Sequence, residues 1–362
     1  MQTPRLTVRD VRARPVSVPL DPPLETAGGA IPTAPLVLVD VLTEEGVSGS
    51  GYVFCYTPAA LQPTARLIVN LAELIKGGPA APAAVEEKLQ RHVRLLGPQG
   101  LTGLAMAVID IALWDALAKA CTLPLARLLG GAPEPVPVYA SLRAMSPERV
   151  AAEAADAAAR GFSAVKLKVG RSDLDADLAV IHAVRRAAGD RTQVMVDYNQ
   201  CLSVPDAIRR AAALDGEGLT WIEEPVRADD YAGHAAIARE ARTPIQIGEN
   251  WWGPHDMAKS LAAGASDYVM IDVSKIGGVT GWVRAAALAG AAGTPASSHI
   301  FPEMSTHLLA VTPTRHWLEY LDFAGPVLRS PLEIHGGRAV ASEHPGIGLD
   351  WNEEAVERAL VE

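Results

Sequence analysis

The chain has 362 residues, of which 49% are hydrophobic and 20% charged, and these values exclude general disorder and indicate a well-packed globular protein. Its length allows two domains, or one barrel of about 250 residues with a smaller domain attached. The 42 acidic residues outnumber the 32 lysines and arginines, so the formal net charge is −10 and we expect no general attraction to nucleic acid or to an anionic membrane surface.

The three cysteines are scattered and lack the paired spacing of a zinc site or a disulfide framework. The first ten residues carry charges where a signal peptide needs an apolar segment, so we expect a cytoplasmic protein. The apolar stretch 104–118 is shorter than a membrane span and contains Asp110 and Asp115. It therefore predicts a buried helix.

Residues 1–130 have the pattern of an α+β domain, with strands first and helices afterwards. Two β-rich runs, 36–42 and 47–54, flank the segment 43–46, whose final glycine indicates a hairpin turn. Helices are predicted at 59–76, 84–94 and 102–120.

From Val136 onward, β-rich runs alternate with helical segments at roughly 20 to 30 residues, the period of βα units. The predicted strands are 136–140, 164–169, 193–197, 220–223, 244–248, 268–272, 295–298 and 317–320. Eight such strands predict an α/β fold, a modified (β/α)8 TIM-type barrel with an N-terminal α+β capping domain. An open doubly wound sheet is the competing architecture, but no GxGxxG motif follows an early strand.

Local signals place several boundaries in this pattern. Ser146 followed by Pro147 and Glu148 predicts a helix start, and Gly161 predicts its end. We expect the barrel to occupy 131–330. Residues 331–362, with a strand-like run at 332–334 and a final helix from Asn352, should return to the capping domain.

Catalytic groups of such barrels lie at the carboxyl ends of the strands, so polar residues that end the predicted strands are the candidates. They are Lys166, Lys168, Asp197, Asn199, Glu223, Glu224, Glu249, Asp272, His299 and Glu319. Lys166 and Lys168 are two apart on one strand, so both side chains should project into the barrel mouth. Crowding two cations lowers the proton affinity of each and would make a lysine an effective base, although a solvated surface pair is the alternative.

Asp197, Glu223 and Glu249 follow three consecutive strands, which should bring three carboxylates together. Oxygen ligands alone select a hard cation such as Mg2+. The alternative is that each carboxylate pairs separately with a lysine or arginine. Spacing does not determine whether Glu223 or Glu224 faces inward.

His299 and Asp272 end neighbouring strands, where the carboxylate could hold one imidazole nitrogen and leave the other to exchange a proton. The alternative is a structural histidine. Glu319 ends the last strand beside the same mouth. A carboxyl group kept protonated by anionic neighbours could donate a hydrogen bond to a developing oxyanion.

The strings PIQIGENWWGP, DVSKIGGVTGW, SSHIF and HWLEYLD, together with TAPLVLVD and YTPAAL, resemble the mandelate racemase group of the enolase superfamily over nearly the whole chain. The resemblance implies a Mg2+ site and a lysine or histidine base. The implied Mg2+ ligands are Asp197, Glu223 and Glu249. Lys168 and His299 would be bases on opposite faces of the substrate, with Asp272 as the partner of His299.

The resemblance also assigns substrate contacts. Lys166 would bind the substrate carboxylate, Glu319 would hydrogen-bond the enolate oxygen, and Asn199 would lie near the α-substituent. Residues 24–33 would form a loop that closes over the mouth and sets the substrate. The residues implied to line the site are Leu24, Thr26, Ile31, Tyr56 and Ser141. A homo-oligomer, an octamer by resemblance, is also implied.

Ile300 and Leu321 suggest an apolar wall, which favours an aryl or bulky alkyl side chain over a polyol. The sequence therefore predicts a Mg2+-dependent racemase of a mandelate-like α-hydroxy carboxylate, a small-molecule substrate. Glu25 could reverse this preference, because a carboxylate turned inward would need a polar or cationic group on the substrate.

Three alternatives remain from the sequence. An acid-sugar dehydratase would use the same lysine, histidine and metal ligands, but the apolar character of the capping loop weighs against it. A cycloisomerase or dipeptide epimerase would want lysine in place of Asp272. A barrel retained only for binding or structure would have lost catalytic residues, and none of those implied is missing.

Overall fold

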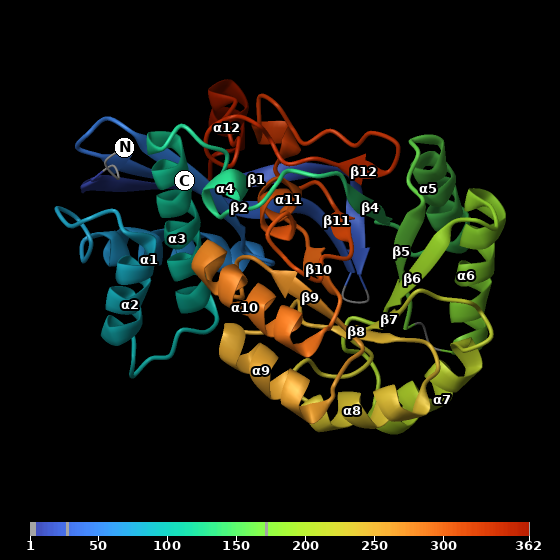
Figure 1. Ribbon diagram of the computed structural model, residues 1–362. Helices are drawn as coiled ribbons and strands as arrows, with labels where there is room; N and C mark the ends of the chain where they lie inside the picture. Colours follow the sequence, from blue (N-terminus) through green and yellow to red (C-terminus); the bar gives the residue numbers. More distant parts are fainter. Residues whose placement is uncertain (1–4, 27–28, 171–172, 362) are drawn as a thin grey trace.

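The structure is a computed structural model that describes residues 5–26, 29–170 and 173–361. The N-terminal part is an antiparallel sheet in the order β1-β2-β3, covered by helices (Figure 1). Its elements are β1 (Val8–Thr26), β2 (Gly29–Thr43), β3 (Ser48–Phe54), α1 (Pro58–Ala72), α2 (Pro82–His92), α3 (Leu101–Ala120) and α4 (Leu125–Leu128). The predicted runs 36–42 and 47–54 and the three predicted helices are present. Strand β1 and the first half of β2 were not predicted from the sequence.

Helix α3 is the buried centre of this domain. By length and composition it could cross a membrane, but most of its residues are buried inside the protein, as the sequence predicted for its apolar stretch. Strand β3 lies so close to it that a Cβ at Gly49 would overlap the carbonyl oxygen of Ala112. Glycine at this position therefore allows the sheet to pack directly on the helix.

The second part is a parallel barrel in the strand order β4 to β10, with β11 beside β4. Its strands are β4 (Val136–Ser141), β5 (Ala164–Lys168), β6 (Gln193–Asp197), β7 (Ile222–Glu223), β8 (Ile245–Ile247), β9 (Tyr268–Asp272), β10 (Ala296–His299) and β11 (Leu318–Tyr320). The backbone N–H of Ser298 donates a 2.9 Å hydrogen bond to the carbonyl of Trp317, which brings β10 and β11 together and nearly closes the ring. The predicted (β/α)8-type barrel with a capping domain is confirmed.

Helices surround the barrel (Figure 1). They are α5 (Pro147–Ala159), α6 (Leu174–Ala188), α7 (Val204–Leu214), α8 (Tyr231–Glu240), α9 (Pro254–Ala263), α10 (Gly278–Ala292) and α11 (Pro302–Leu309). The predicted start of α5 is confirmed, because the Ser146 side chain accepts a hydrogen bond from the backbone N–H of Arg149. The interior is filled below the mouth by large side chains such as Tyr139, Met195 and Trp221.

The C-terminal segment contains the short 3-10 helix η1 (Gly325–Val327), β12 (Arg338–Ala339) and α12 (Glu353–Ala359). The strand predicted at 332–334 is absent, and β12 pairs antiparallel with β4 instead. The final helix begins after Asn352, whose side chain accepts a hydrogen bond from the backbone of Ala355. Leu360 bridges to Val16 of β1, so the chain does return to the capping domain.

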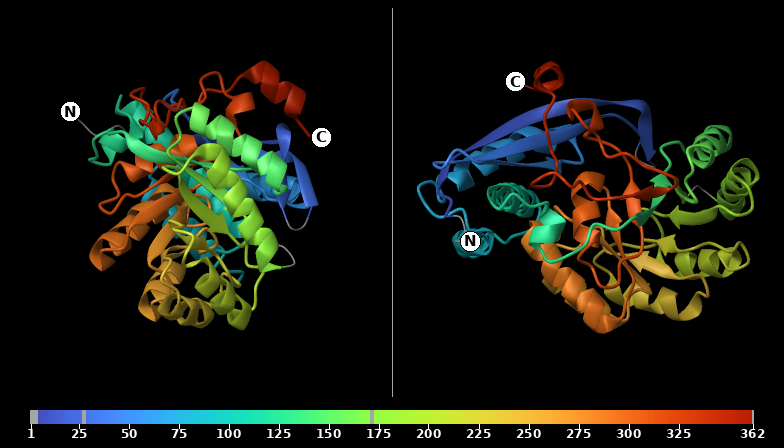
Figure 2. Two further views of the ribbon diagram at one scale, coloured as in Figure 1. Left: turned by 90° about the vertical axis from the view of Figure 1, so that its right-hand side faces the viewer. Right: turned by 45° about the horizontal axis from the view of Figure 1, so that its top comes forward.

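The hairpin of β1 and β2 extends from the capping domain to the α5 side of the barrel (Figure 2). Backbone pairing is interrupted between Pro19 and Leu24 and resumes with Leu24 opposite Ile31. This arrangement places the end of the hairpin beside the residues that follow β4.

Candidate active site

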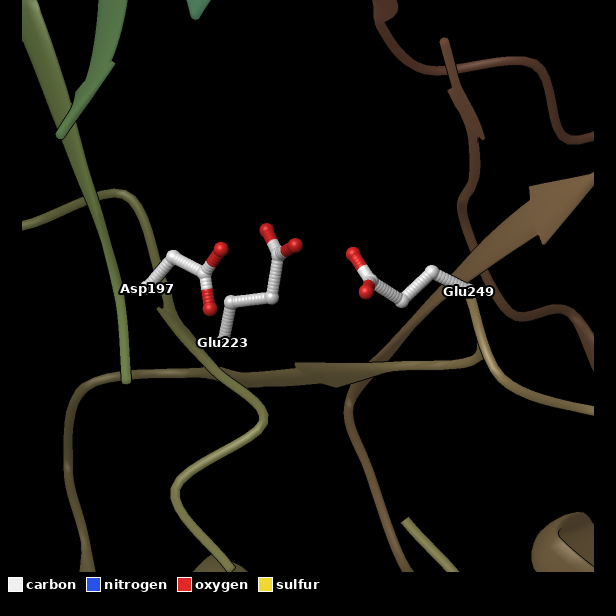
Figure 3. A group of neighbouring side chains, drawn as sticks. All are labelled: Asp197, Glu223 and Glu249. Atoms are coloured by element: carbon white, nitrogen blue, oxygen red, sulfur yellow. The ribbon is translucent and has the colours of Figure 1, made fainter. Parts of the chain in front are cut away.

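Three carboxylates meet at the carboxyl ends of consecutive barrel strands. Asp197 ends β6, Glu223 ends β7 and Glu249 follows β8, and one oxygen of each lies within 4.8 Å of the others. All three side chains are buried, and they point toward a common centre (Figure 3). Three oxygen ligands at this spacing fit a Mg2+ ion.

The electrostatics of this cluster also fit a cation. Burial raises the pKa of Asp197, and the charge of Glu249 adds to the increase. Burial raises the pKa of Glu223 well above its ordinary value, with a contribution from Asp197. Lys166 opposes both increases. Burial would raise the pKa of Glu249, but His299 and Lys275 lower it to about 2. A divalent cation would relieve the repulsion that remains among the three carboxylates.

The structure decides between the two adjacent glutamates. Glu223 faces the cluster, where its Oε2 accepts a 3.0 Å hydrogen bond from Trp221 Nε1. Glu224 has a φ of +35° and turns toward Asn250, whose Nδ2 donates to Glu224 Oε2 at 2.7 Å. The first glutamate is the one in the carboxylate cluster, as the resemblance implied.

Lys166 does not have the lowered proton affinity that crowding with Lys168 predicted. Its Nζ lies 2.7 Å from Glu223 Oε1 and 2.9 Å from Glu319 Oε1. Burial would lower the pKa of Lys166, but these two carboxylates raise it well above its ordinary value. Lys166 is therefore a fixed cation because its nearest neighbours are anions.

Lys168 has a different environment, since it is only partly buried and has no carboxylate at contact distance among the described residues. Its Nζ donates a 2.9 Å hydrogen bond to Asn199 Oδ1, and Asn199 Nδ2 donates to Asp197 Oδ2 at 2.8 Å. Asn199 thus joins a candidate base to a candidate metal ligand.

His299 and Asp272 form the predicted pair. His299 Nδ1 lies 2.6 Å from Asp272 Oδ2, and because a carboxylate only accepts, the proton is on Nδ1. The other nitrogen, Nε2, lies 3.3 Å from Glu249 Oε2. Burial would lower the pKa of His299, but the charge of Glu249 and the bond to Asp272 raise it.

Glu319 lies at the predicted place, but its surroundings lower its pKa instead of raising it. Burial would raise the pKa of its carboxyl group, whereas the charges of Lys166 and His299 lower it. The Glu319 carboxylate lies 2.9 Å from Lys166 Nζ and 4.0 Å from His299 Nε2. The lowered pKa does not favour the protonated Glu319 that the sequence suggested, and the hydrogen bond of Glu319 to the enolate oxygen stays a prediction.

Most of these groups line one cavity of about 140 Å3, while Glu223 and Asp272 are not part of its lining. Its polar lining is Ser141, Lys166, Lys168, Asp197, Asn199, Glu249, His299 and Glu319. Its less polar lining is Leu24, Ile31, Phe54, Tyr56, Ile300, Leu321 and Phe323. All the predicted lining residues with described side chains are present, while the side chain of Thr26 and residues 27–28 lie outside the described structure.

Phe54 and Phe323 also line the cavity and were not predicted from the sequence. Their rings are stacked with centroids 4.6 Å apart, although they come from different domains. Each lies two residues from a predicted lining residue, Phe54 before Tyr56 and Phe323 after Leu321. Their positions, two residues from predicted lining residues, are the signal that could have identified them.

Glu25 does not face the cavity. Its Oε2 accepts a 2.7 Å hydrogen bond from the backbone N–H of Met145, and its Oε1 pairs with Arg149. The backbone N–H of Glu25 also donates to the carbonyl of Arg143 at 2.8 Å. The carboxylate that could have reversed the apolar preference instead attaches the hairpin to the barrel.

Comparisons with known proteins agree with this geometry. Residues 8–130 match the N-terminal domain of the mandelate racemase / muconate lactonizing enzyme family, and 149–355 match the enolase C-terminal domain-like family. A solved enolase from Bradyrhizobium complexed with magnesium and mandelic acid is 44% identical, with both chains covered completely and a TM-score of 0.94.

Two curated relatives have other activities. A 3,6-anhydro-alpha-L-galactonate cycloisomerase from Streptomyces coelicolor is 32% identical over 98% of this chain and 99% of its own. An L-talarate/galactarate dehydratase from Salmonella typhimurium is 30% identical over 88% of this chain and 81% of its own. Both family matches and the buried carboxylate cluster support one conclusion: the chain belongs to the mandelate racemase / muconate lactonizing enzyme family and is a Mg2+-dependent enzyme of the enolase superfamily.

Proposed function

We propose that this enzyme racemises an aryl α-hydroxy carboxylate, mandelate or a close analogue, with one base on each face of the substrate. The observation that carries the proposal is that Lys168, His299 and an aromatic wall line the same small cavity as Asp197 and Glu249 of the carboxylate cluster. The likeness to a structure that holds mandelic acid supports the substrate class.

Removal of a proton α to a carboxylate produces a dianionic enolate, so the site must concentrate positive charge. Mg2+ bound by Asp197, Glu223 and Glu249 would supply electrophilic stabilisation of the carboxylate oxygens. Lys166 is held as an ammonium at the same cavity and would add a second positive charge there.

The two bases would work in opposite protonation states. The neutral one removes the α-proton, and the electron pair of the C–H bond passes into the enolate. The protonated one then returns a proton to the opposite face of the same carbon, which inverts its configuration. Asp272 would keep Nδ1 of His299 protonated and direct Nε2 at the substrate.

The apolar lining favours an aryl group over a polyol. A sugar acid has several hydroxyl groups that each need a hydrogen-bond partner when buried. Phe54, Phe323 and Leu321 offer none, and Glu25 is engaged outside the cavity. The alternative, dehydration of an acid sugar, would use the same two bases but would leave those hydroxyl groups unpaired on this side.

Polarimetry with (R)- and (S)-mandelate and Mg2+ tests the proposal, with galactarate and L-glucarate assayed in parallel for the keto acids of dehydration. Loss of optical activity from both enantiomers supports it. Turnover restricted to a sugar acid contradicts it. The homo-oligomeric state and the cytoplasmic location stay predictions.

A further inference from the structure

Asp272, the partner of His299, is held from two directions. Its Oδ1 accepts hydrogen bonds from the backbone and hydroxyl of Ser274, at 2.7 and 2.6 Å, and from the backbone of Lys275 at 2.9 Å. Its Oδ2 is shared by His299 and by the hydroxyl of Tyr56, which donates at 3.1 Å. The oxygen that orients the imidazole therefore also depends on a residue of the capping domain.

The side chain of Lys275 lies over the ring of Tyr56. Its ammonium group is 4.2 Å from the centre of the Tyr56 ring and donates a 2.6 Å hydrogen bond to Asn250 Oδ1. The residue is only 6% exposed, and among the described residues it forms no ion pair within 4.0 Å. A buried ammonium without an ion pair is unfavourable unless other groups compensate it. Here an aromatic face and an amide oxygen do so at contact distance, and the charges of Glu224, Glu249 and Asp272 act on it from farther away.

Tyr56 needs such support. It follows the end of β3 and has a φ of +60°, a region that aromatic side chains rarely adopt. Its ring also contacts Phe54, with the centroids 4.6 Å apart. The cation–π contact on the ring and the hydroxyl bond to Asp272 thus fix a residue whose backbone conformation is strained.

We propose that Lys275 is a positioning residue, whose ammonium group fixes Tyr56 so that the tyrosine hydroxyl holds Asp272 and thereby orients His299. The inference rests on the proposed function, in which His299 is the base on one face. Lys168 has no described contact with Lys275 or Tyr56 and is held by Asn199. We call the chain of contacts from Lys275 through Tyr56 to Asp272 the clamp. It should therefore affect proton transfer on one face of the substrate and leave the other face unaffected.

The test measures α-proton exchange with solvent deuterium for each mandelate enantiomer, with the Mg2+-loaded enzyme and its Lys275→Met and Tyr56→Phe variants. We expect Lys275→Met to slow His299-dependent exchange about tenfold or more, and to change Lys168-dependent exchange by less than about twofold. Tyr56→Phe, which keeps the ring, should show the same selectivity. Equal losses on both faces would overturn the proposal, because a general structural defect acts on both.

The double variant Tyr56→Phe/Lys275→Met decides whether Lys275 acts through Tyr56. If it does, the double variant loses no more His299-dependent exchange than Lys275→Met alone. If the two losses multiply, the residues act independently and the clamp is refuted. Lys259→Met, at an exposed lysine, is the control for loss of one positive charge and should retain wild-type exchange on both faces.

A measurement without substrate separates this inference from the proposed function. The proton between His299 Nδ1 and Asp272 should give a low-field 1H NMR signal, identified by its loss in His299→Asn. We expect the signal to shift or broaden in both Tyr56→Phe and Lys275→Met. An unchanged signal in both variants would refute the clamp, even if mandelate turned over. A changed signal would support it even if wild type exchanged neither enantiomer, a result that would reject the substrate. If Lys275→Met fails to fold, the same measurements are made on Lys275→Gln, which also removes the ammonium charge, and an unchanged signal in that variant would refute the proposal.

Discussion

Lys166 Nζ lies 2.7 Å from Glu223 Oε1, so a candidate metal ligand is also the ion-pair partner of a buried lysine. The same ammonium lies 2.9 Å from Glu319, and the three side chains are at most 4% exposed. Lys166→Met would leave two buried carboxylates without their cation. We expect a loss of about 3 to 5 kcal/mol in the free energy of unfolding, as for other broken buried ion pairs.

Urea unfolding in the presence of a chelator measures this loss, and the exposed Lys259→Met is the matched control. Addition of Mg2+ should recover part of the stability of Lys166→Met, because a cation bound to Glu223 replaces some of the missing charge. Equal stability of Lys166→Met and wild type in chelator would contradict the ion-pair account.

Removal of the metal or of one ligand should abolish turnover. Glu249→Gln keeps the size of the side chain but removes one of the three negative charges of the cluster. We expect this variant to remain folded by circular dichroism and to lose Mg2+ affinity in calorimetric titration. Full wild-type turnover in excess chelator would rule out the proposed role of the cluster.

The two candidate bases should be separable by isotope exchange. His299→Asn should stop racemisation but leave Lys168 able to exchange the α-proton of one enantiomer. Replacing Lys168 by alanine should leave only the opposite enantiomer exchangeable, because each base reaches one face. NMR in deuterium oxide follows both reactions. A single variant that exchanges both enantiomers at wild-type rates would show that the assignment of one base to each face is wrong.

Glu25 should affect substrate binding without contacting the substrate. Its carboxylate accepts from Met145 and pairs with Arg149, while the adjacent Leu24 lines the cavity. We expect Glu25→Ala to raise KM several-fold with a smaller change in kcat, because loosening the hairpin costs binding first. Arg149→Ala should have the weaker effect, since an exposed ion pair contributes only about 0 to 1 kcal/mol.

Steady-state kinetics on mandelate separate kcat from KM for these variants. The control is Glu148→Ala, which removes a neighbouring exposed carboxylate that makes no described contact with the hairpin. Wild-type kinetics for Glu25→Ala would contradict a role of this contact in holding the hairpin.

Much of the barrel could be predicted from sequence because its signal is periodic. Short apolar runs that end in Asp197, Glu223 and Asp272 define strands and place the side chains at one end of the barrel. The long strand β1 was not predicted because prolines interrupt the alternation of apolar and polar residues that is typical of a strand. They include Pro15 and Pro19.

The charge states of the site could not be predicted from spacing. The distance between Lys166 and Lys168 along the strand suggested cation crowding, but Lys166 contacts Glu223 and Glu319 from other strands. The direction of Glu25 was similarly undetermined, because its partners near the start of α5 are more than a hundred residues away in sequence. Contacts between segments far apart in sequence, which spacing does not encode, set both outcomes.

The stacked rings of Phe54 and Phe323 line the cavity. The central claim is therefore that the substrate carries an aryl side chain. The most direct measurement is kcat/KM for (R)- and (S)-mandelate and for galactarate, on wild type and on Phe323→Ala. We predict that both mandelates racemise, that galactarate is turned over at least about a hundredfold less efficiently, and that Phe323→Ala loses mandelate efficiency because an apolar contact is removed. Preferential conversion of galactarate to a keto acid, with no change in the optical rotation of mandelate, would contradict the account.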